Sequence, residues 1–336
     1  MQSSSRRAFL MGRRSAQNPW DVFCQRVRRS VAGTLFDFGI QDGVGSARLT
    51  PKQAADVQHA RALCTEYGVV LALDGIQHAE KLDGHPVLWV DPGRDMAGCQ
   101  RLSNDSSKWF IQPGCLLGEL EAQGLRQFAD LPCHLTVAAW LADRTLCDWD
   151  SGETVKSGLA HVSVLLADGT SANLGPFGEH NQQPLGSLSL QKMIPALFQL
   201  AGQDSAKIAR QQTRWPARYR LDALLPAEGA SVNLSHLVLG HGGDLGWVEW
   251  IVLDEQALQE PSTQAQQLEQ ADSQAASRPV FSMHVDAMDQ GMGLLATELD
   301  AQVKALFDPL GLFPHPGQDL MQAPRRSFTQ DWGQDP

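Results

Sequence analysis

Residues 132–170, PCHLTVAAWLADRTLCDWDSGETVKSGLAHVSVLLADGT, combine a helix start, a loop and a strand within one stretch. Thr136 can be the N-cap of a short helix, because its side chain can accept a hydrogen bond from the first helical turn. The apolar run over residues 159–167 predicts a strand. Asp168 and Gly169 then predict a tight turn, after which the chain returns as the second arm of a hairpin. We expect the rest of the chain to be organised around this unit.

The helix start at Thr136 also predicts an anion-binding site. The first N–H groups of a helix have no partner within the helix, and the helix dipole adds a partial positive charge there. Ala138 and Ala139 have small side chains, which would let a phosphate approach the backbone closely. We therefore expect the backbone from Thr136 through Val137 to Ala139 to contact a pyrophosphate.

The segment that begins at Thr50 predicts a helix followed by a buried strand. Thr50 can be the N-cap, Pro51 the first helical residue and Gln53 the partner in a capping box. Gly68 is placed to end the helix. Residues 69–73 then form an apolar run that is typical of a buried strand.

The remainder of the chain continues this mixture of helices and strands. Apolar runs indicate the strands, and apolar residues at helical spacing indicate the helices. The predicted strands cover residues 87–90, 109–114, 247–253 and 279–285, and the predicted helices cover residues 116–125, 191–201 and 294–307.

Taken in order, these stretches resemble the FAD-binding domain of the vanillyl-alcohol oxidase and p-cresol methylhydroxylase family, the PCMH-type FAD-linked oxidases. Thr136 and Val137 match the family's Thr-(Ile/Val)-Gly-Gly helix start, although two alanines replace the glycines. Residues 165–169, LLADG, match its Val-Leu-Ala-Asp-Gly segment. Residues 237–248, LVLGHGGDLGWV, resemble its Val-Gly-Ser-Glu-Gly-Thr-Leu-Gly-Ile-Ile block. Before Gly152, a serine stands where the family has a tyrosine.

Residues 74–78, DGIQH, stand where the family carries an Arg-Gly-Gly-Gly loop against the flavin phosphates. This loop keeps Gly75 but lacks the arginine and two of the glycines, and Asp74 would repel a pyrophosphate. His78 falls where some relatives attach the flavin covalently. The alternative interpretation of His78 is a solvated loop histidine.

The resemblance implies an α+β fold in which two subdomains of a PCMH-type FAD-binding domain meet at a cofactor cleft, with a truncated C-terminal substrate region. It implies that FAD is bound, with non-covalent attachment favoured, and that the Gly75 loop and the Thr136 helix start line the same cleft. No catalytic residue and no metal site can be assigned from residue spacing. The implied cofactor-binding residues are Gly75, His78, Thr136, Val137, Ala138, Ala139, Gly152, Gly240, Gly243 and Val248.

The domain boundaries follow from composition and from the order of the matching stretches. Arginines crowd the first thirty residues and predict a basic arm, and a segment rich in Gln, Ala, Glu and Ser predicts a linker. The predicted parts are an arm over residues 1–40, an FAD-binding domain over 41–255 with subdomains 41–98 and 99–255, a linker over 256–278, a remnant of the substrate domain over 279–320 and a tail over 321–336.

The composition excludes several classes of protein. The chain has 336 residues, 43% of them hydrophobic and 19% charged, which is typical of a soluble globular protein. A net charge of -11 argues against nucleic acid as a partner, and no apolar run approaches the roughly 18 residues of a membrane span. The six cysteines show no Cys-x-x-Cys pair, so we expect reduced thiols in the cytoplasm, with any membrane association made through partners.

In length and layout the chain resembles the flavin subunit of bacterial glycolate oxidase. This implies an FAD-binding oxidoreductase subunit that acts on a 2-hydroxy acid of the glycolate or D-lactate type. It also implies partners, either other oxidase subunits or an electron-acceptor protein. The missing glycines and tyrosine keep a second interpretation open, in which the chain is a non-catalytic homologue that serves as a scaffold or interaction subunit.

Overall fold

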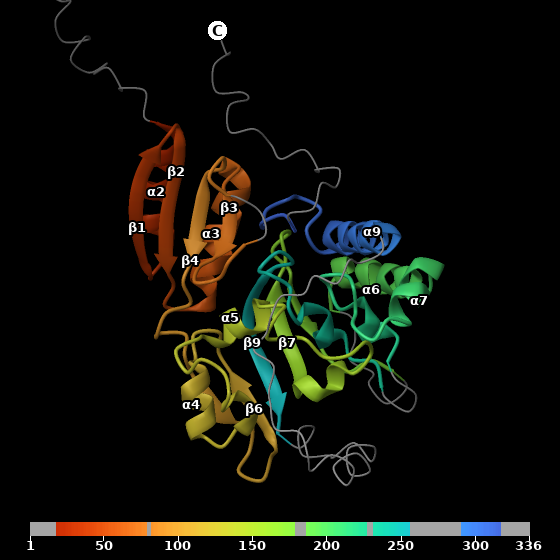
Figure 1. Ribbon diagram of the computed structural model, residues 1–336. Helices are drawn as coiled ribbons and strands as arrows, with labels where there is room; N and C mark the ends of the chain where they lie inside the picture. The colour runs from red at the N-terminus through yellow and green to blue at the C-terminus, as the bar shows by residue number, and fades with distance from the viewer. Residues whose placement is uncertain (1–17, 79–81, 179–185, 227–230, 256–289, 317–336) are drawn as a thin grey trace, which may run out of the picture.

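The computed structural model describes residues 18–78, 82–178, 186–226, 231–255 and 290–316. Two sheets, each with its own helices, form the body of the molecule (Figure 1). The first sheet has the strand order β1-β2-β4-β3 and the second has the order β5-β6-β9-β7-β8. The predicted α+β class, with two subdomains, is therefore confirmed.

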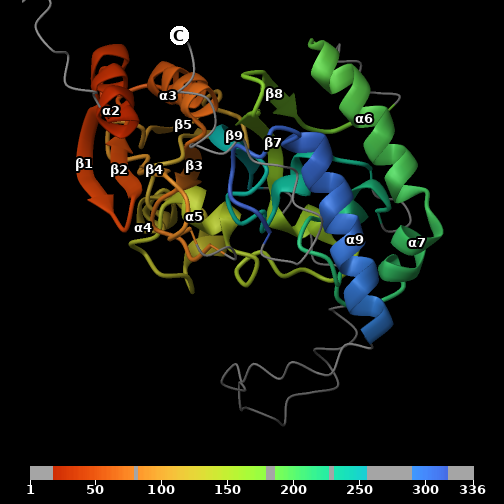
Figure 2. The same cartoon turned by 90° about the horizontal axis from the view of Figure 1, so that it is seen from above.

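In the first subdomain, β2, β4 and β3 are parallel and β1 is antiparallel to β2. Helices α2 and α3 lie together over one face of this sheet (Figure 2). The elements are α2 Pro19–Ser30, β1 Thr34–Gln41, β2 Val44–Thr50, α3 Ala54–Tyr67, β3 Val70–Leu73 and β4 Val87–Val90.

The predicted N-terminal arm is wrong from Pro19 onward, because α2 and β1 belong to the first subdomain. Trp20 and Phe23 are buried in its core, and the Trp20 indole donates a hydrogen bond to Asp37 of β1 at 3.0 Å. Arg26, Arg28 and Arg29 lie on the exposed side of this amphipathic helix, where Arg28 pairs with Asp37 at 3.6 Å. Residues 1–17 lie outside the described residues.

The predicted cap of the next helix is also wrong. Thr50 ends β2, and Gln53 is the N-cap of α3 without a side-chain cap hydrogen bond. The buried carboxylate of Asp56 ties the helix start to the preceding turn instead, because it accepts hydrogen bonds at 2.9 Å from the N–H groups of Ala32, Gly33 and Lys52. Gly68, with φ of 66°, ends α3 as predicted.

In the second subdomain all strand pairs are antiparallel. Helices α6, α7 and α9 pack side by side on its outer flank (Figures 1 and 2). The strands are β5 Cys99–Arg101, β6 Lys108–Ile111, β7 Leu159–Leu165, β8 Ser171–Leu174 and β9 Trp247–Asp254. The helices are α4 Leu117–Ala122, η1 Arg126–Phe128, α5 Val137–Ala142, η2 Thr154–Ser157, α6 Leu188–Ala201, α7 Asp204–Arg210, η3 Leu221–Leu224, η4 Leu234–Val238 and α9 Gln290–Phe307.

Most of the predicted elements of this half are confirmed. The strands β7 and β8 form the expected hairpin around Asp168 and Gly169, and β9 and α6 cover their predicted segments. The first sheet ends at Val90 and the second begins at Cys99. The predicted linker, the strand over residues 279–285 and the tail lie outside the described residues.

The C-terminal segment after α9 connects the two subdomains. Lys304 of α9 pairs with Asp308 at 2.6 Å, and both side chains are buried. Asp308 also accepts hydrogen bonds from the N–H groups of Leu312 and Phe313 at 2.9 Å. The carbonyl of Leu312 in turn accepts from the N–H of Leu71 in β3, at 3.0 Å. This segment therefore fixes α9 to the first sheet.

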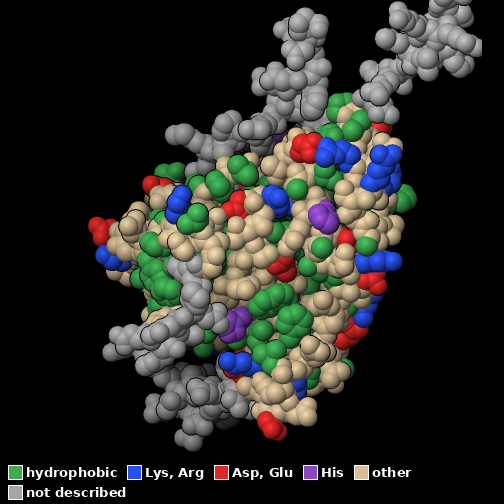
Figure 3. Space-filling view, turned by 180° about the vertical axis from the view of Figure 1, so that it is seen from behind, with side chains coloured by type: hydrophobic (Ala, Val, Ile, Leu, Met, Phe, Trp, Pro, Cys, Tyr) green, Lys and Arg blue, Asp and Glu red, His purple; other side chains and the backbone are tan. Residues whose placement is uncertain are grey.

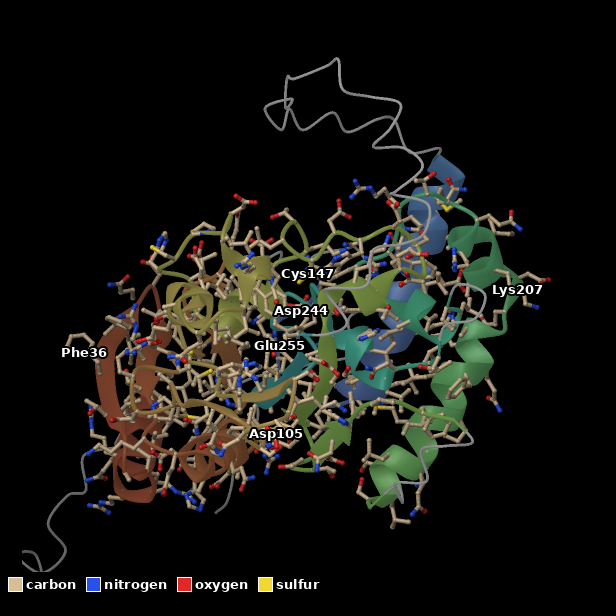
Figure 4. All side chains as sticks on the ribbon, turned by 90° about the horizontal axis from the view of Figure 1, so that it is seen from below. Phe36, Asp105, Cys147, Lys207, Asp244 and Glu255 are labelled. Carbon is tan, nitrogen blue, oxygen red and sulfur yellow. The ribbon has the colours of Figure 1, made fainter. Side chains whose placement is uncertain are left out.

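The surface carries charges of both signs. On the rear face, Lys and Arg side chains lie next to Asp and Glu side chains (Figure 3). Among the described helices, none is long and apolar enough to cross a membrane. Figure 4 shows Asp244 toward the middle of the molecule, whereas Phe36 lies on the outer strand of the first sheet and Lys207 at the outer surface of α7.

Candidate functional site

A cavity of about 500 Å³ lies where the two subdomains meet. The loop after β3 and helix α5 line this same cavity, although α5 does so through Ala139 and Ala142 and not through Thr136, Val137 or Ala138. The lining consists of residues 75–78, Leu135, Ala139 and Ala142 of α5, residues 143–145, Arg218 and Gly242. The volume lies within the range of about 300–1,000 Å³ that is usual for small-molecule sites.

The loop after β3 leaves space beside its backbone. Gly75 has a φ of 82°, and a Cβ added to it would meet no heavy atom within 4 Å. A ligand can therefore approach this backbone closely. The expected repulsion from Asp74 is reduced, because its carboxylate forms an ion pair with Arg48 at 2.5 Å and accepts a hydrogen bond from the Gly75 N–H at 2.9 Å.

His78 is held against the protein and is not a solvated loop histidine. Its Nε2 lies 2.7 Å from the carbonyl oxygen of Leu73, and since a carbonyl can only accept, Nε2 carries the proton. The ring also packs against Trp89, with 5.7 Å between the ring centroids. These contacts fix the imidazole at the wall of the cavity.

The start of α5 does not offer free hydrogen-bond donors. Thr136 is the N-cap as predicted, and its Oγ1 accepts from the Ala139 N–H at 3.2 Å. The N–H groups of Val137 and Ala138 donate to backbone carbonyls of the loop before α4, at 2.8 and 3.0 Å. The predicted contact between this helix start and a pyrophosphate is therefore wrong, because the chain itself supplies the acceptors. Sequence alone could not reveal a neighbouring loop at this position.

Several glycines near the predicted phosphate site make room for arginine side chains of the same chain. All of them have positive φ, between 68° and 76°. An added Cβ would lie 2.1 Å from Arg210 Nη2 at Gly152, 2.7 Å from Arg144 Cδ at Gly240 and 2.2 Å from Arg218 Nη1 at Gly242. The glycines are therefore required by internal packing, whether or not a cofactor is bound.

Four more of the predicted residues lie behind the cavity wall or away from it. Gly152 and Gly240 are not part of the described lining. Val248 is buried in β9, where it pairs with Val164 of β7. Gly243 lies behind the loop after β3, because a Cβ there would be 3.4 Å from the His78 ring. Direct cofactor contacts from Gly152, Gly240 and Val248 are therefore not supported.

Two arginines that the sequence did not single out bring positive charge to the cavity. Arg144 donates to the carbonyls of Cys147 and Trp215 at 2.8 and 3.1 Å, and burial lowers its pKa from the usual value. Arg218 forms an ion pair with the fully buried Asp244 at 3.3 Å. A guanidinium has five N–H donors in a fixed fork, so each arginine is held in place and can still contact an anion.

His241 lies beside this site and is 2% exposed. Neither of its ring nitrogens has a hydrogen-bond partner among the described residues. Burial, followed by the positive charges of Arg218, His78 and Lys304, lowers the pKa of His241 to about 3. The imidazole is therefore neutral at physiological pH. Within the described ranges, no group of three His, Cys, Asp or Glu residues could hold a metal ion.

The chain is similar to several solved structures. Several solved structures that match are PCMH-type FAD-linked oxidases. No protein-family model and no curated protein matches the chain. One match is an alkyldihydroxyacetonephosphate synthase, with 15% identity and a TM-score of 0.36 over 63% of this chain and 32% of that chain. Another is a carbohydrate oxidase from Microdochium nivale, with 12% identity and a TM-score of 0.36 over 69% of this chain and 42% of that chain. A third is a 4-ethylphenol oxidase from Gulosibacter chungangensis, with 12% identity and a TM-score of 0.41 over 70% of this chain and 42% of that chain.

These proteins are of the kind that the sequence resembles. The chain matches less than half of the length of each of them. With TM-scores of 0.36 to 0.41, the superpositions carry no information on individual site residues. The site must therefore be judged from its own side chains.

Part of the cavity lining fits the pyrophosphate of a dinucleotide cofactor. The open backbone at Gly75, the small side chains of Ala139 and Ala142, and the two arginine forks provide space and positive charge for a pyrophosphate. The first turn of α5 offers no free N–H donor, because its N–H groups already have acceptors within the chain. A cofactor would therefore be held by the loop and the arginines, not by the helix start.

Proposed function

We propose that the protein is a flavin-binding subunit of an oxidoreductase, which holds FAD non-covalently in the cavity between its two subdomains. The observation that supports this most strongly is that the loop after β3 and helix α5, far apart in sequence, line one cavity together with Arg144 and Arg218. In this proposal the two guanidinium groups and the backbone of residues 75–78 hold the pyrophosphate. Ala139 and Ala142 leave space for the cofactor.

The bound FAD would supply the ability to accept a hydride, which no side chain can do. The protein would supply binding and orientation through the loop, and positive charge through the arginines. A 2-hydroxy acid of the glycolate or D-lactate type is the proposed substrate class, and another oxidase subunit or an acceptor protein would receive the electrons. His78 is fixed by Leu73 and is expected to stay unmodified, so the flavin should be released on denaturation.

The binding site can be tested by filling the cavity from its rim. Thr145 is exposed and lines the cavity, so Thr145→Trp should block it without disturbing the core. We expect FAD affinity, measured by titration of flavin fluorescence, to fall by roughly tenfold or more, or about 1.4 kcal/mol. Thr65→Trp, at an exposed position on α3, is the matched control and should bind like the wild type. Equal affinity in both variants would place the flavin elsewhere.

A scaffold function is the second candidate, and a specific observation favours it. The first N–H groups of α5 are satisfied by the chain itself, and arginine side chains occupy the space beside Gly152 and Gly240. Purified protein that has no flavin absorption, and acquires none on incubation with FAD, would support this function over the first. Flavin that remains attached after denaturation would instead indicate a covalent bond at His78.

We expect the isolated, flavin-loaded chain not to oxidise a 2-hydroxy acid at a useful rate. Hydride transfer needs a cationic clamp for the substrate carboxylate and a base for its hydroxyl proton. In the proposed complex Arg144 and Arg218 hold the pyrophosphate, so they do not also clamp the substrate carboxylate, and His241 is buried. Assays with glycolate or D-lactate and an artificial electron acceptor should show turnover only after a co-purifying subunit is added. Turnover by the chain alone would contradict this expectation.

A further inference from the structure

Cys99 and Cys115 lie together at a second cavity. This cavity has a volume of about 300 Å³ and is lined by Ala97, Cys99, Cys115, Glu119, Ala122 and Gln123. Cys99 begins β5 and is half-buried, whereas Cys115 follows β6 and is 1% exposed. The side chains of both cysteines therefore face the same cavity. Both cysteines are free thiols.

Backbone hydrogen bonds on either side of the pair fix this arrangement. The Gln112 N–H donates to the Gly98 carbonyl, and the Gly98 N–H donates to the Gln112 side chain, both at 2.8 Å. The Gly114 N–H donates to the Met96 carbonyl at 2.7 Å. Gly114 is required here, because an added Cβ would lie 2.0 Å from the carbonyl oxygen of Gly93. Gly98, which precedes Cys99, is therefore held against Gln112, and Gly114, which precedes Cys115, is held against Met96.

The two thiols differ in their chemistry. The neighbouring Cys115 thiol favours a thiolate on Cys99 and lowers the pKa of Cys99. The same contact, together with burial, raises the pKa of Cys115. Cys115 Sγ also lies 3.7 Å from Glu119 Oε2, and this carboxylate forms an ion pair with Arg94. Cys99 is therefore the thiol that ionises first and the one that small molecules in solution can reach.

We propose that Cys99 and Cys115 form a reversible dithiol–disulfide pair, which exchanges with a small-molecule disulfide that enters the second cavity. The Cys99 thiolate attacks one sulfur of that disulfide, which forms a mixed disulfide and releases one small thiolate. Cys115 then loses its proton to water and attacks the Cys99 sulfur, which forms the Cys99–Cys115 bond and releases the second thiolate. The two protein thiols are oxidised, and the small disulfide is reduced to two thiols.

The pair is linked to the cavity between the subdomains through the backbone of Cys115. The carbonyl oxygen of Cys115 accepts the hydrogen bond from the N–H of Val137, the first residue of α5, at 2.8 Å. Helix α5 contributes Ala139 and Ala142 to that cavity. The oxidation state of the pair is therefore connected to the position of a helix that lines the larger site.

Oxidised glutathione is a suitable probe, and Cys133→Ser is the background because Cys133 is exposed. Trypsin separates the two cysteines into peptides 95–101 and 109–126. We expect mass spectrometry of the oxidised protein to find these peptides joined, and a reducing agent to separate them. In the same background, Cys115→Ser should stop at a stable glutathione adduct on Cys99. A wild-type pair that stays reduced, or that retains glutathione on Cys99, would overturn the proposal.

A second measurement tests the roles of the two thiols while the protein stays folded. Cys115→Ala removes the thiol that lowers the pKa of Cys99, so the pH midpoint for alkylation of Cys99 should rise. Its alkylation rate at pH 7 should fall by about threefold or more. Cys147→Ala, which removes a buried thiol elsewhere in the second subdomain, should leave the rate unchanged. An unchanged rate in Cys115→Ala would show that Cys115 does not activate Cys99.

Discussion

Asp222→Ala is expected to lower the free energy of unfolding by about 3–5 kcal/mol, because it leaves a buried arginine without its counter-ion. The side chains of Arg220 and Asp222 are both 0% exposed and form a two-point ion pair, with N···O distances of 2.9 and 2.7 Å. Asp222 also accepts a hydrogen bond from the Gly152 N–H at 2.7 Å. The substitution therefore removes the partner of a buried charge and the acceptor of a buried N–H group.

Unfolding by denaturant, followed by two spectroscopic probes, measures this loss. Asp204→Ala is the control, because Asp204 of α7 is exposed and its pairing with Lys207 at 3.8 Å is screened by solvent; no measurable change is expected. The double variant Arg220→Met/Asp222→Leu should recover much of the stability, since no unpaired charge is left. A loss in Asp222→Ala no larger than in the control would contradict the assigned role of the pair.

Local features of the chain could be predicted from the sequence, whereas contacts between distant segments could not. Thr136 as a cap, Gly68 as a helix end and the turn at Asp168 and Gly169 were predictable, because each depends on residues within one or two turns of chain. Gly152 was predicted as a cofactor contact, yet it packs against Arg210 and donates to Asp222. Such contacts join residues far apart in the chain, and no local pattern records them.

One missed element did have a local signal. Asn18 followed by Pro19 is a common helix start, and the buried positions Trp20, Phe23 and Val27 recur at helical spacing. The prediction of a basic arm rested on the arginines and did not consider these apolar residues. The occupied N–H groups at the start of α5 had no such signal, because their acceptors lie in a loop whose position depends on the packing of the second subdomain.

The strongest dependence of stability on pH is expected from two buried histidines. His236 is held neutral, because its Nε2 donates to the Leu159 carbonyl at 2.8 Å and its Nδ1 accepts from the Thr154 hydroxyl at 2.9 Å. Burial lowers the pKa of His236 to about 4, and burial and the nearby positive charges lower the pKa of His241 to about 3. Both groups have an ordinary pKa of 6.5.

The unfolded chain therefore binds protons at these histidines below pH 6.5, whereas the folded protein does not, so stability is full above pH 6.5 and falls as the pH is lowered. Between pH 7 and pH 5 the two histidines together should remove about 4 kcal/mol from the free energy of unfolding, before the carboxylates titrate appreciably. In His241→Leu the change in the free energy of unfolding between pH 7 and pH 5 should be about half as large, because one of the two histidines is removed. The control is His59→Gln, at an exposed position on α3, which should show the same change as the wild type. Denaturant unfolding at pH 7, 6 and 5 measures the dependence for each variant. Equal free energies of unfolding at pH 7 and pH 5 in the wild type would show that these imidazoles are protonated in the folded protein.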